Sequence, residues 1–302
     1  MAVVDVVELP LGRRSVRAAV DAARLRQWTK NALIFAGIVF AARIGDWQRW
    51  SEAVAAFLAY CAASSAAYLV NDVRDTELDR LHPVKRHRPI ASGDLSERAA
   101  LGVAIVLAAF AVAVASLLGT RSLALVLAFL SLQAAYSLGL KHVLLLDVAA
   151  IAGLFVIRAA AGAVAVRVHI SVWLLVCTAL LALFLALAKR RAELVLVAEK
   201  ATPGRPVLHG YSRYSQGLLD RLVVVLAAAT VVVYALYTAV SGNSRLLVLT
   251  VPLVAFGIGR YVLLVRSHGA GEEPEEILLQ DLPLLGAIGL WVVACAAILL
   301  AA

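Results

Sequence analysis

Long apolar runs separated by short polar segments set the pattern of this chain of 302 residues. A helix needs about 20 apolar residues to cross the ~30 Å hydrocarbon core of a bilayer. Nine runs approach or reach this length, at 28–42, 50–71, 97–118, 122–140, 143–166, 171–188, 218–240, 246–265 and 282–301. The pattern predicts an all-α integral membrane protein, a bundle of nine transmembrane helices in a single domain over residues 1–302.

The residues before the first run, 1–27, have a different pattern, in which arginines are interspersed with Val and Ala. Such a pattern is typical of a helix that lies on an anionic membrane surface. Its arginines are Arg13, Arg14, Arg17, Arg24 and Arg26. The segment lacks the features of a signal peptide, so we predict an interfacial amphipathic N-terminal segment that leads into the first span.

The distribution of Lys and Arg predicts the orientation of the bundle. If the N-terminus lies inside, the inner segments hold 21 of the 28 Lys and Arg residues and the outer loops hold five, while Arg158 and Arg260 lie within spans. Positive residues concentrate in cytoplasmic loops. We therefore expect a multi-pass protein of the cell membrane, with its N-terminus cytoplasmic and its C-terminus outside.

Composition narrows the class of protein. Hydrophobic residues make up 63% of the chain, well above the ~45–50% of soluble domains. The net charge of +8 lies in short segments at the edges of the runs, so we expect a lipid bilayer and no nucleic acid as a partner. Cys61, Cys177 and Cys295 lie inside apolar runs without metal-ligand spacing, and we interpret them as small buried side chains.

Several links between spans are short, notably the one around Gly119 and the one around Lys141. Short links make consecutive helices antiparallel neighbours. We therefore expect a compact bundle around a cytoplasm-facing cavity. The sequence leaves open whether this bundle forms a homo-oligomer.

The stretch 68–93 carries the strongest chemical signal. Asn71, Asp72, Asp75 and Asp79 lie at helical spacing, within roughly a third of the circumference of one helix. Carboxylates this close repel one another unless a cation lies among them. Such oxygen ligands suit Mg²⁺, which takes one or two carboxylates and completes its shell with water and phosphates. We predict a Mg²⁺ site at these four residues; the alternative is a solvated helix end of mixed charge.

Basic and polar residues on the same predicted side of the membrane suit phosphate groups. Lys85, Arg86 and Arg88 follow the acidic residues directly. The other candidates are Gln27, Lys30 and Asn31 at the start of the first span, Lys141 and Asp147, and Lys189, Arg190 and Glu193 at the end of the sixth. Two of these sets have an alternative explanation without a binding role. The residues around Trp28 could anchor the helix at the membrane interface, and Lys189 could form a surface ion pair with Glu193.

Arg158 is unusual because it lies about 16 Å deeper than Asp147 by helical rise, near the same helix face. A buried arginine is costly in lipid and should face a polar cavity or a partner. No acid lies one turn away in its helix, so we favour a site role over a structural ion pair. Two further inner loops are expected: 202–215, which could cover the cavity, and the acidic stretch 271–276.

Three motifs resemble those of one known family, the UbiA-type intramembrane prenyltransferases. They are Asn71-Asp72-x-x-Asp75-x-x-x-Asp79 with Lys85-Arg86-x-Arg88, Tyr136-Ser137-x-x-Leu140-Lys141, and Arg158-Ala159-x-Ala161-Gly162. The resemblance implies a nine-helix fold whose first motif holds a Mg²⁺-diphosphate. The second region departs from the family pattern of two acids four residues apart, because Asp147 is followed at that spacing by Ile151.

Within that family, the chain resembles one branch, the decaprenyl-phosphate phosphoribosyltransferases. The similarity rests on Arg26-Gln27-Trp28-x-Lys30-Asn31, Tyr68 to Asp75, Leu140-Lys141-His142, Lys189-Arg190-x-Ala192-Glu193-Leu194, and Gly271-Glu272-x-Pro274-Glu275 with Asp281. The resemblance implies transfer of phosphoribose from phosphoribosyl pyrophosphate to a polyprenyl phosphate, a step toward the arabinose donor of cell-wall arabinan. This reaction uses one diphosphate and so requires one acidic cluster. The presence of Ile151 in place of the second acid is consistent with that requirement.

The resemblance also implies roles for the candidate residues. Asp72 and Asp75, helped by Asn71 and Asp79, would bind Mg²⁺ on the donor diphosphate, while Lys85, Arg86 and Arg88 would neutralise the leaving group. Lys30, Lys141, Lys189 and Arg190 would hold the lipid phosphate or the donor 5-phosphate. Tyr136, Asp147 and Glu193 would orient the sugar, and Gln27, Asn31, Tyr68 and Arg158 would complete the substrate site.

Two other functions stay open at this point. The first is a prenyltransferase that acts on an aromatic quinone precursor and uses a polyprenyl diphosphate. The second is a membrane transporter or lipid-binding protein without catalytic activity, in which the acidic helix end is structural.

Overall fold

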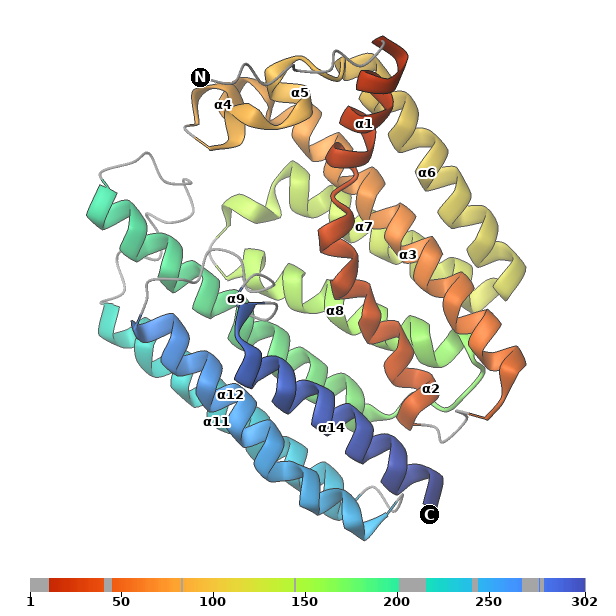
Figure 1. The fold of residues 1–302 in the computed structure, drawn as a ribbon, viewed down its shortest axis with the longest axis vertical. Coiled ribbons are helices and arrows are strands. Elements are labelled where there is room, and N and C mark those ends of the chain that lie inside the picture. Colours follow the sequence, from red (N-terminus) through yellow and green to blue (C-terminus); the bar gives the residue numbers. More distant parts are fainter. Residues whose placement is uncertain are drawn as a thin grey trace, which may run out of the picture.

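The computed structural model describes residues 11–40, 45–82, 84–143, 145–200, 216–240, 244–267, 277 and 280–301. Helices account for nearly all of these residues (Figure 1). In chain order they are α1 Leu11–Ala22, η1 Leu25–Phe35, α2 Ala36–Phe40, α3 Trp47–Arg74, α4 Thr76–Leu81, η2 Lys85–His87, α5 Pro89–Ser92, α6 Glu97–Leu118, α7 Thr120–Leu138, η3 Leu140–His142, α8 Leu146–Ala165, α9 Val172–Lys200, α11 Gln216–Val240, η4 Arg245–Thr250, α12 Val251–Ser267 and α14 Leu282–Ala301.

Eight helical segments in the described part of the chain are long and apolar enough to cross a membrane. They correspond to the predicted runs from 50–71 to 282–301. The first predicted run, 28–42, has a different structure: the 3₁₀ helix η1 covers Leu25–Phe35 and passes into the short helix α2. Arg24, which precedes η1, has the left-handed backbone angle φ of 53°, which interrupts the helix between α1 and η1.

The transmembrane helices pack in two groups with α8 between them (Figure 1). On one side, α3 packs along α6 and also contacts α7. On the other side, α9 packs on α11, and α12 packs on α11 and α14. The η1–α2 segment contacts both α3 and α8, and α2 also contacts α14, so this segment closes the bundle.

Small residues allow this close packing. The buried face of α3 includes Ala56, Ala59 and Ala63, and α6 turns alanines toward it. The approach is closest between η1 and α8, where a Cβ atom added at Gly162 would lie 2.0 Å from the carbonyl oxygen of Ile34. Small residues let membrane helices approach in this way, so Gly162 fixes the place where η1 lies against α8.

Capping residues and one glycine set the helix ends. Asp46 accepts hydrogen bonds from the backbone N–H groups of Gln48 and Arg49 at the start of α3, and Ser96 caps α6 through Ala99. Gly119, with φ of 120°, is the single residue between α6 and α7, which confirms the predicted short link.

The segment after α3 brings charged residues back toward the bundle. The α3 helix ends at Arg74, and α4, η2 and α5 follow as short helices, of which α5 packs against α1 (Figure 1). Arg88 precedes α5, where Pro89 occupies the first helical turn. This geometry returns the Arg88 side chain to the acidic end of α3, nine residues after Asp79.

Candidate active site

Asp72, on the last turn of α3, is buried and lies between two arginines. The Arg24 Nη2 atom donates hydrogen bonds to both carboxylate oxygens, at 2.6 and 2.7 Å. Arg88 donates to Asp72 Oδ1 at 3.2 Å and to Asp79 Oδ2 at 2.6 Å. Residues from the N-terminal segment, α3, α4 and the start of α5 therefore form one charged cluster, in which the aspartates are buried and the arginines are half-buried.

Asp75 belongs to a second group. Both of its oxygens accept hydrogen bonds from Lys141 Nζ at 2.9 Å, and the Asn71 side-chain amide donates to Asp75 Oδ2 at 3.1 Å. Lys141 also donates to Asn71 Oδ1 at 3.3 Å. The η3 turn between α7 and α8 thus supplies a cation to the end of α3, across 66 positions of sequence.

The four motif residues do not lie on one continuous helix, as the spacing had suggested. The α3 helix ends before Asp75, whose backbone angles, φ −92° and ψ 7°, lie outside the helical range, and α4 begins at Thr76. As a result, Asp72 and Asp79 bind Arg88 while Asp75 binds Lys141. The cations that relieve the repulsion among the carboxylates are side chains of the chain itself.

The predicted phosphate-binding bases after α4 separate in the structure. Arg88 is part of the Asp72 cluster. Lys85, half-buried, and Arg86, exposed, lie on η2, and Arg86 Nε donates to His87 Nε2 at 3.2 Å. The structure therefore brings Arg88 to Asp72 and Asp79, and it places Lys85 and Arg86 on the separate short helix η2.

A further buried cluster surrounds Arg190 of α9. Its Nε atom donates to Asp147 Oδ2 at 2.6 Å, with exposed side-chain fractions of only 1% for Arg190 and 0% for Asp147. Arg190 also donates to the Glu193 carboxylate and, at 3.4 Å, to the Tyr136 hydroxyl group. Tyr136 on α7, Asp147 on α8 and Glu193 on α9 are thus brought together, as predicted for one site, and Arg190 is their common partner.

Arg158, in the middle of α8, is buried among neutral groups. In the described part of the chain its Nε donates to Asn31 Oδ1 at 2.6 Å, and its Nη atoms donate to the Leu154 carbonyl at 3.1 Å and to Ser64 Oγ at 3.4 Å. The guanidinium carbon lies 4.7 Å from the centre of the Phe129 ring, within the range of a cation–π interaction. Arg158 therefore has polar partners on η1 and α3, as expected for an arginine buried at this depth in the membrane.

The other predicted site residues lie around these clusters. Gln27 and Lys30 are half-buried on η1, and Lys189 is half-buried on α9 next to Arg190. Tyr68 of α3 lies under the Arg24 guanidinium group, whose carbon is 5.1 Å from the ring centre. Asn31 also donates from Nδ2 to Cys61 Sγ at 3.3 Å, which ties η1 to α3.

Two predicted segments fall outside the described residues: the loop 202–215 and the acidic stretch 271–276. Asp281, which follows the second of these, accepts a hydrogen bond from Arg260 Nη2 at 2.9 Å and caps α14 through the Leu284 N–H group. The Arg260 hydrogen bond lowers the pKa of the Asp281 carboxyl below its ordinary value.

Arg24 is the functional candidate that sequence reasoning missed. It was counted only among the surface arginines of the amphipathic segment, yet it forms the shortest contacts to Asp72. Its position three residues before Gln27 could have suggested a site role, but its partner lies 48 residues away in the sequence.

The chemistry of these donors suits a metal that is shared with a phosphorylated substrate. Among the residues that the structure describes, no three His, Cys, Asp or Glu side chains form a metal-binding group by themselves. Asp72 and Asp75 nevertheless fit Mg²⁺, because this ion is commonly held by one or two carboxylates and completed by phosphate oxygens and water.

Fold and site together define a helical membrane protein whose acidic and basic side chains gather at the ends of α3, α7 and α9 and at the start of α8. The chain belongs to the UbiA prenyltransferase family, whose model matches residues 32–276. The resemblance indicated by the motifs is therefore confirmed.

Relatives within the family are similar over most of their length. The chain is 38% identical over 286 residues to the decaprenyl-phosphate phosphoribosyltransferase of Mycobacterium tuberculosis, covering 92% of each protein. It is 36% identical over 282 residues to the protein of the same name from Mycolicibacterium smegmatis, covering 88% of this chain and 87% of that one.

Solved structures support the same fold. A UbiA homologue from Archaeoglobus fulgidus, bound to GPP and Mg²⁺, superposes with a TM-score of 0.71 at 19% identity. The match covers 93% of this chain and 99% of that one. Because the sequence identity is only 19%, this similarity shows a shared fold and nothing about the function.

Proposed function

We propose that this chain transfers 5-phosphoribose from phosphoribosyl pyrophosphate to a polyprenyl phosphate such as decaprenyl phosphate, and releases pyrophosphate. The names of the similar mycobacterial proteins support this activity. Under this proposal the donor carries the diphosphate, and the lipid carries the nucleophile. The site therefore needs one acidic cluster for a Mg²⁺-diphosphate and additional cations for two monophosphate groups.

The observation that carries the proposal is the set of contacts made by Asp147 and Ile151 in the second motif region. Asp147 is fully buried and bound by Arg190, and Ile151 packs against an apolar core cluster. This region thus offers a cation with its carboxylate partners rather than a pair of free carboxylates. The two neighbouring carboxylates at the end of α3, Asp72 and Asp75, fit a single diphosphate, and the Arg190 cluster fits a phosphate or a sugar hydroxyl group.

Substrate binding would exchange the partners of Asp72 and Asp75. Asp72 and Asp75 are now neutralised by Arg24, Arg88 and Lys141. If the two carboxylates turn to Mg²⁺, these three cations become available to phosphate oxygens, so charge stays balanced throughout. When bound, Mg²⁺ would withdraw charge from the leaving diphosphate.

The reaction then needs positioning more than proton transfer. The bond between the anomeric carbon of ribose and the diphosphate oxygen breaks, and positive charge develops on the sugar. A phosphate oxygen of the lipid forms the new bond from the opposite face, with inversion. This nucleophile is already ionised and requires no strong base, so orientation and electrostatic stabilisation suffice. Lys85, Arg86 and Arg88 would receive the leaving group, and Tyr136 and Glu193 would orient the sugar.

One assay tests the function. Purified protein is incubated with Mg²⁺, phosphoribosyl pyrophosphate labelled in the ribose, and decaprenyl phosphate, and the products are extracted into organic solvent. We expect a labelled lipid that is lost when EDTA is added. Absence of the labelled lipid would overturn the proposal. Transfer from a polyprenyl diphosphate to an aromatic acid would establish the aromatic prenyltransferase instead, and absence of both products would favour the transporter or lipid-binding function.

We also propose the membrane arrangement. The η1–α2 segment would supply a ninth crossing beside the eight long helices, because helical rises over its 11 and 5 residues give a length of roughly 30 Å. The bias of Lys and Arg supports a cytoplasmic N-terminus and site, with a cavity that opens to the cytoplasm and the C-terminus outside.

A further inference from the structure

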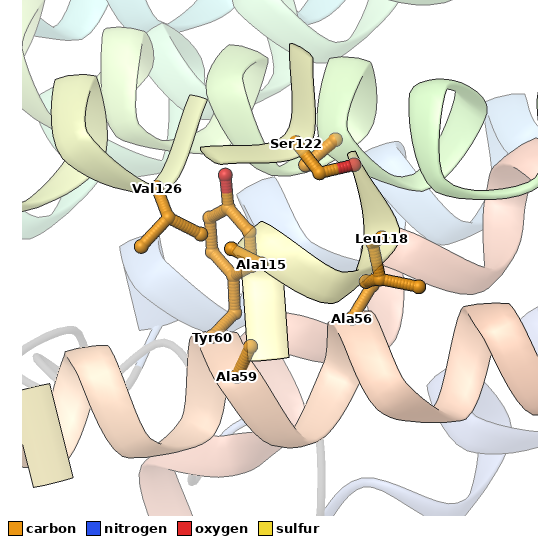
Figure 2. A pocket seen from close by; sticks show the side chains of 8 residues that line it. Ala56, Ala59, Tyr60, Ala115, Leu118, Ser122 and Val126 are labelled. Carbon is orange, nitrogen blue, oxygen red and sulfur yellow. The ribbon is translucent and has the colours of Figure 1, made fainter. Parts of the chain in front are cut away.

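A small cavity lies inside the bundle, at the corner where α6 passes into α7 (Figure 2). Its walls are mainly small apolar side chains, including Ala59 of α3 and Ala115 of α6. Two hydroxyl groups also line it. Tyr60 rises from α3 toward the corner, and Ser122 lies at the start of α7 (Figure 2).

Both hydroxyl groups are buried without a hydrogen-bond partner among the described residues. Tyr60 is 2% exposed and Ser122 is 6% exposed. A buried hydroxyl group normally has a partner, because leaving it without one costs free energy. Tyr60 and Ser122 line the same cavity, so a single ligand in it could bond both hydroxyl groups. They come from different helices and do not hydrogen bond to each other.

The size of the cavity limits the ligand. The centre of a water-sized sphere can occupy about 10 Å³ within it. This is close to the lower limit for one water molecule and too small for a larger ligand. A buried water normally makes two to four hydrogen bonds to polar groups that otherwise have none, and this cavity offers two such groups.

We propose that this cavity is a binding site for one ordered water molecule, which bridges the Tyr60 hydroxyl group and Ser122 Oγ. The water would accept from one hydroxyl group and donate to the other, and so connect α3 to α7 inside the membrane. Its effect reaches further, because the Tyr60 ring packs edge-on against Phe129 with centres 5.0 Å apart. Phe129 in turn lies under the Arg158 guanidinium group.

The direct test is an experimental density map of the whole protein, at a resolution that shows ordered water. We expect a peak within hydrogen-bond distance of both Tyr60 and Ser122. A cavity without this peak, with the two side chains in the positions described here, would overturn the proposal. So would Tyr60 and Ser122 side chains that move to bond other protein groups.

A double-mutant cycle, measured by thermal unfolding in detergent, supplies an independent test. Tyr60→Phe and Ser122→Ala each remove one partner of the water and leave the other without it, so each should lower Tm by about 2–6 °C. The double variant should lose no more than the worse single variant, because both substitutions remove the same bridge. Ser116→Ala is the matched control, since the exposed Ser116 hydroxyl group donates to the Val112 carbonyl one turn before it and does not line the cavity.

Other results of the cycle would contradict the shared water. If the hydroxyl groups face each other across the cavity with no bridging molecule, removing either one should leave Tm unchanged or raise it. If each hydroxyl group has a separate partner, the two losses should add in the double variant. None of these results depends on the proposed transferase activity.

Discussion

At the scale of single residues, Asp72 has the central position in the site. It is buried, it accepts hydrogen bonds from Arg24 and Arg88, and it belongs to the motif expected to meet Mg²⁺. A buried carboxylate with two arginine partners can release them to a phosphorylated substrate only if another cation replaces them. The charge of Asp72, rather than its shape, should therefore decide activity.

We predict that Asp72→Asn lowers the rate of phosphoribosyl transfer at least about 100-fold, because it removes a ligand charge but little volume. The measurement is labelled lipid formed per minute by the purified variant, with Tm as a check of folding. Glu77→Gln is the control, because the Glu77 side chain is 92% exposed and should leave the rate nearly unchanged. A rate near that of the wild type in Asp72→Asn would remove this residue from the site.

The second motif region allows the two enzyme functions to be separated. We predict that Asp147→Asn causes a smaller loss, about 10-fold, because the amide keeps its shape and one hydrogen bond to Arg190. Ile151→Asp should damage the reaction without creating transfer from a polyprenyl diphosphate, because a carboxylate there would be costly to bury and would repel phosphates. The measurement compares both donors in both variants. Transfer from the diphosphate by Ile151→Asp would favour the aromatic prenyltransferase.

The sequence motifs predicted candidate site residues, but not which of them contact one another. Tyr136, Asp147, Arg190 and Glu193 were all candidates, and the structure brings them together. Arg24 was missed because its contact with Asp72 joins residues 48 positions apart and depends on the break between α1 and η1 at Arg24. The split between Asp72 and Asp75 was missed because helical spacing assumes that the helix continues, whereas α3 ends at Arg74.

At the scale of elements, the contact between η1 and α8 determines where Asn31 meets Arg158. We predict that Gly162→Ala lowers Tm by roughly 5 °C or more, because its Cβ atom would lie 2.0 Å from the Ile34 carbonyl oxygen and force the two segments apart. Thermal unfolding in detergent measures this change. Gly102→Ala on α6 is the matched control, since no atom lies within 4 Å of its added Cβ, and alanine favours helix. Equal Tm values for the two variants would contradict the close approach.

Hydropathy predicted the long helices well because each one must satisfy its own backbone in lipid. The eight long spans lie where the apolar runs occur, and the one-residue link at Gly119 ends a helix as expected. The run at 28–42 could not reveal a 3₁₀ helix, because hydropathy measures length and polarity but not the hydrogen-bond pattern. The conformation of η1 follows from tertiary packing on α3 and α8.

At the scale of the whole molecule, all the charged clusters depend on contacts between helices that are distant in sequence. Lys141 joins the end of α7 to the end of α3, and Arg190 joins α9 to α8. These pairs place the site at one end of the bundle. Its orientation in the membrane then decides whether a water-soluble, highly charged donor made inside the cell can reach it.

We predict that this end faces the cytoplasm, and α3 provides the means to test it. Glu77→Cys lies just beyond the C-terminal end of α3, and Trp47→Cys lies at its N-terminal end, where Trp47 is 85% exposed. In intact cells, a maleimide that cannot cross membranes should label Trp47→Cys only, whereas Glu77→Cys should require permeabilised cells. Unsubstituted protein is the control for background labelling, since Cys61 and Cys295 are buried and Cys177 lies within a membrane span. Labelling of Glu77→Cys in intact cells would place Asp72 and its partners outside, where phosphoribosyl pyrophosphate from the cytoplasm could not reach them, and would contradict both the orientation and the proposed donor.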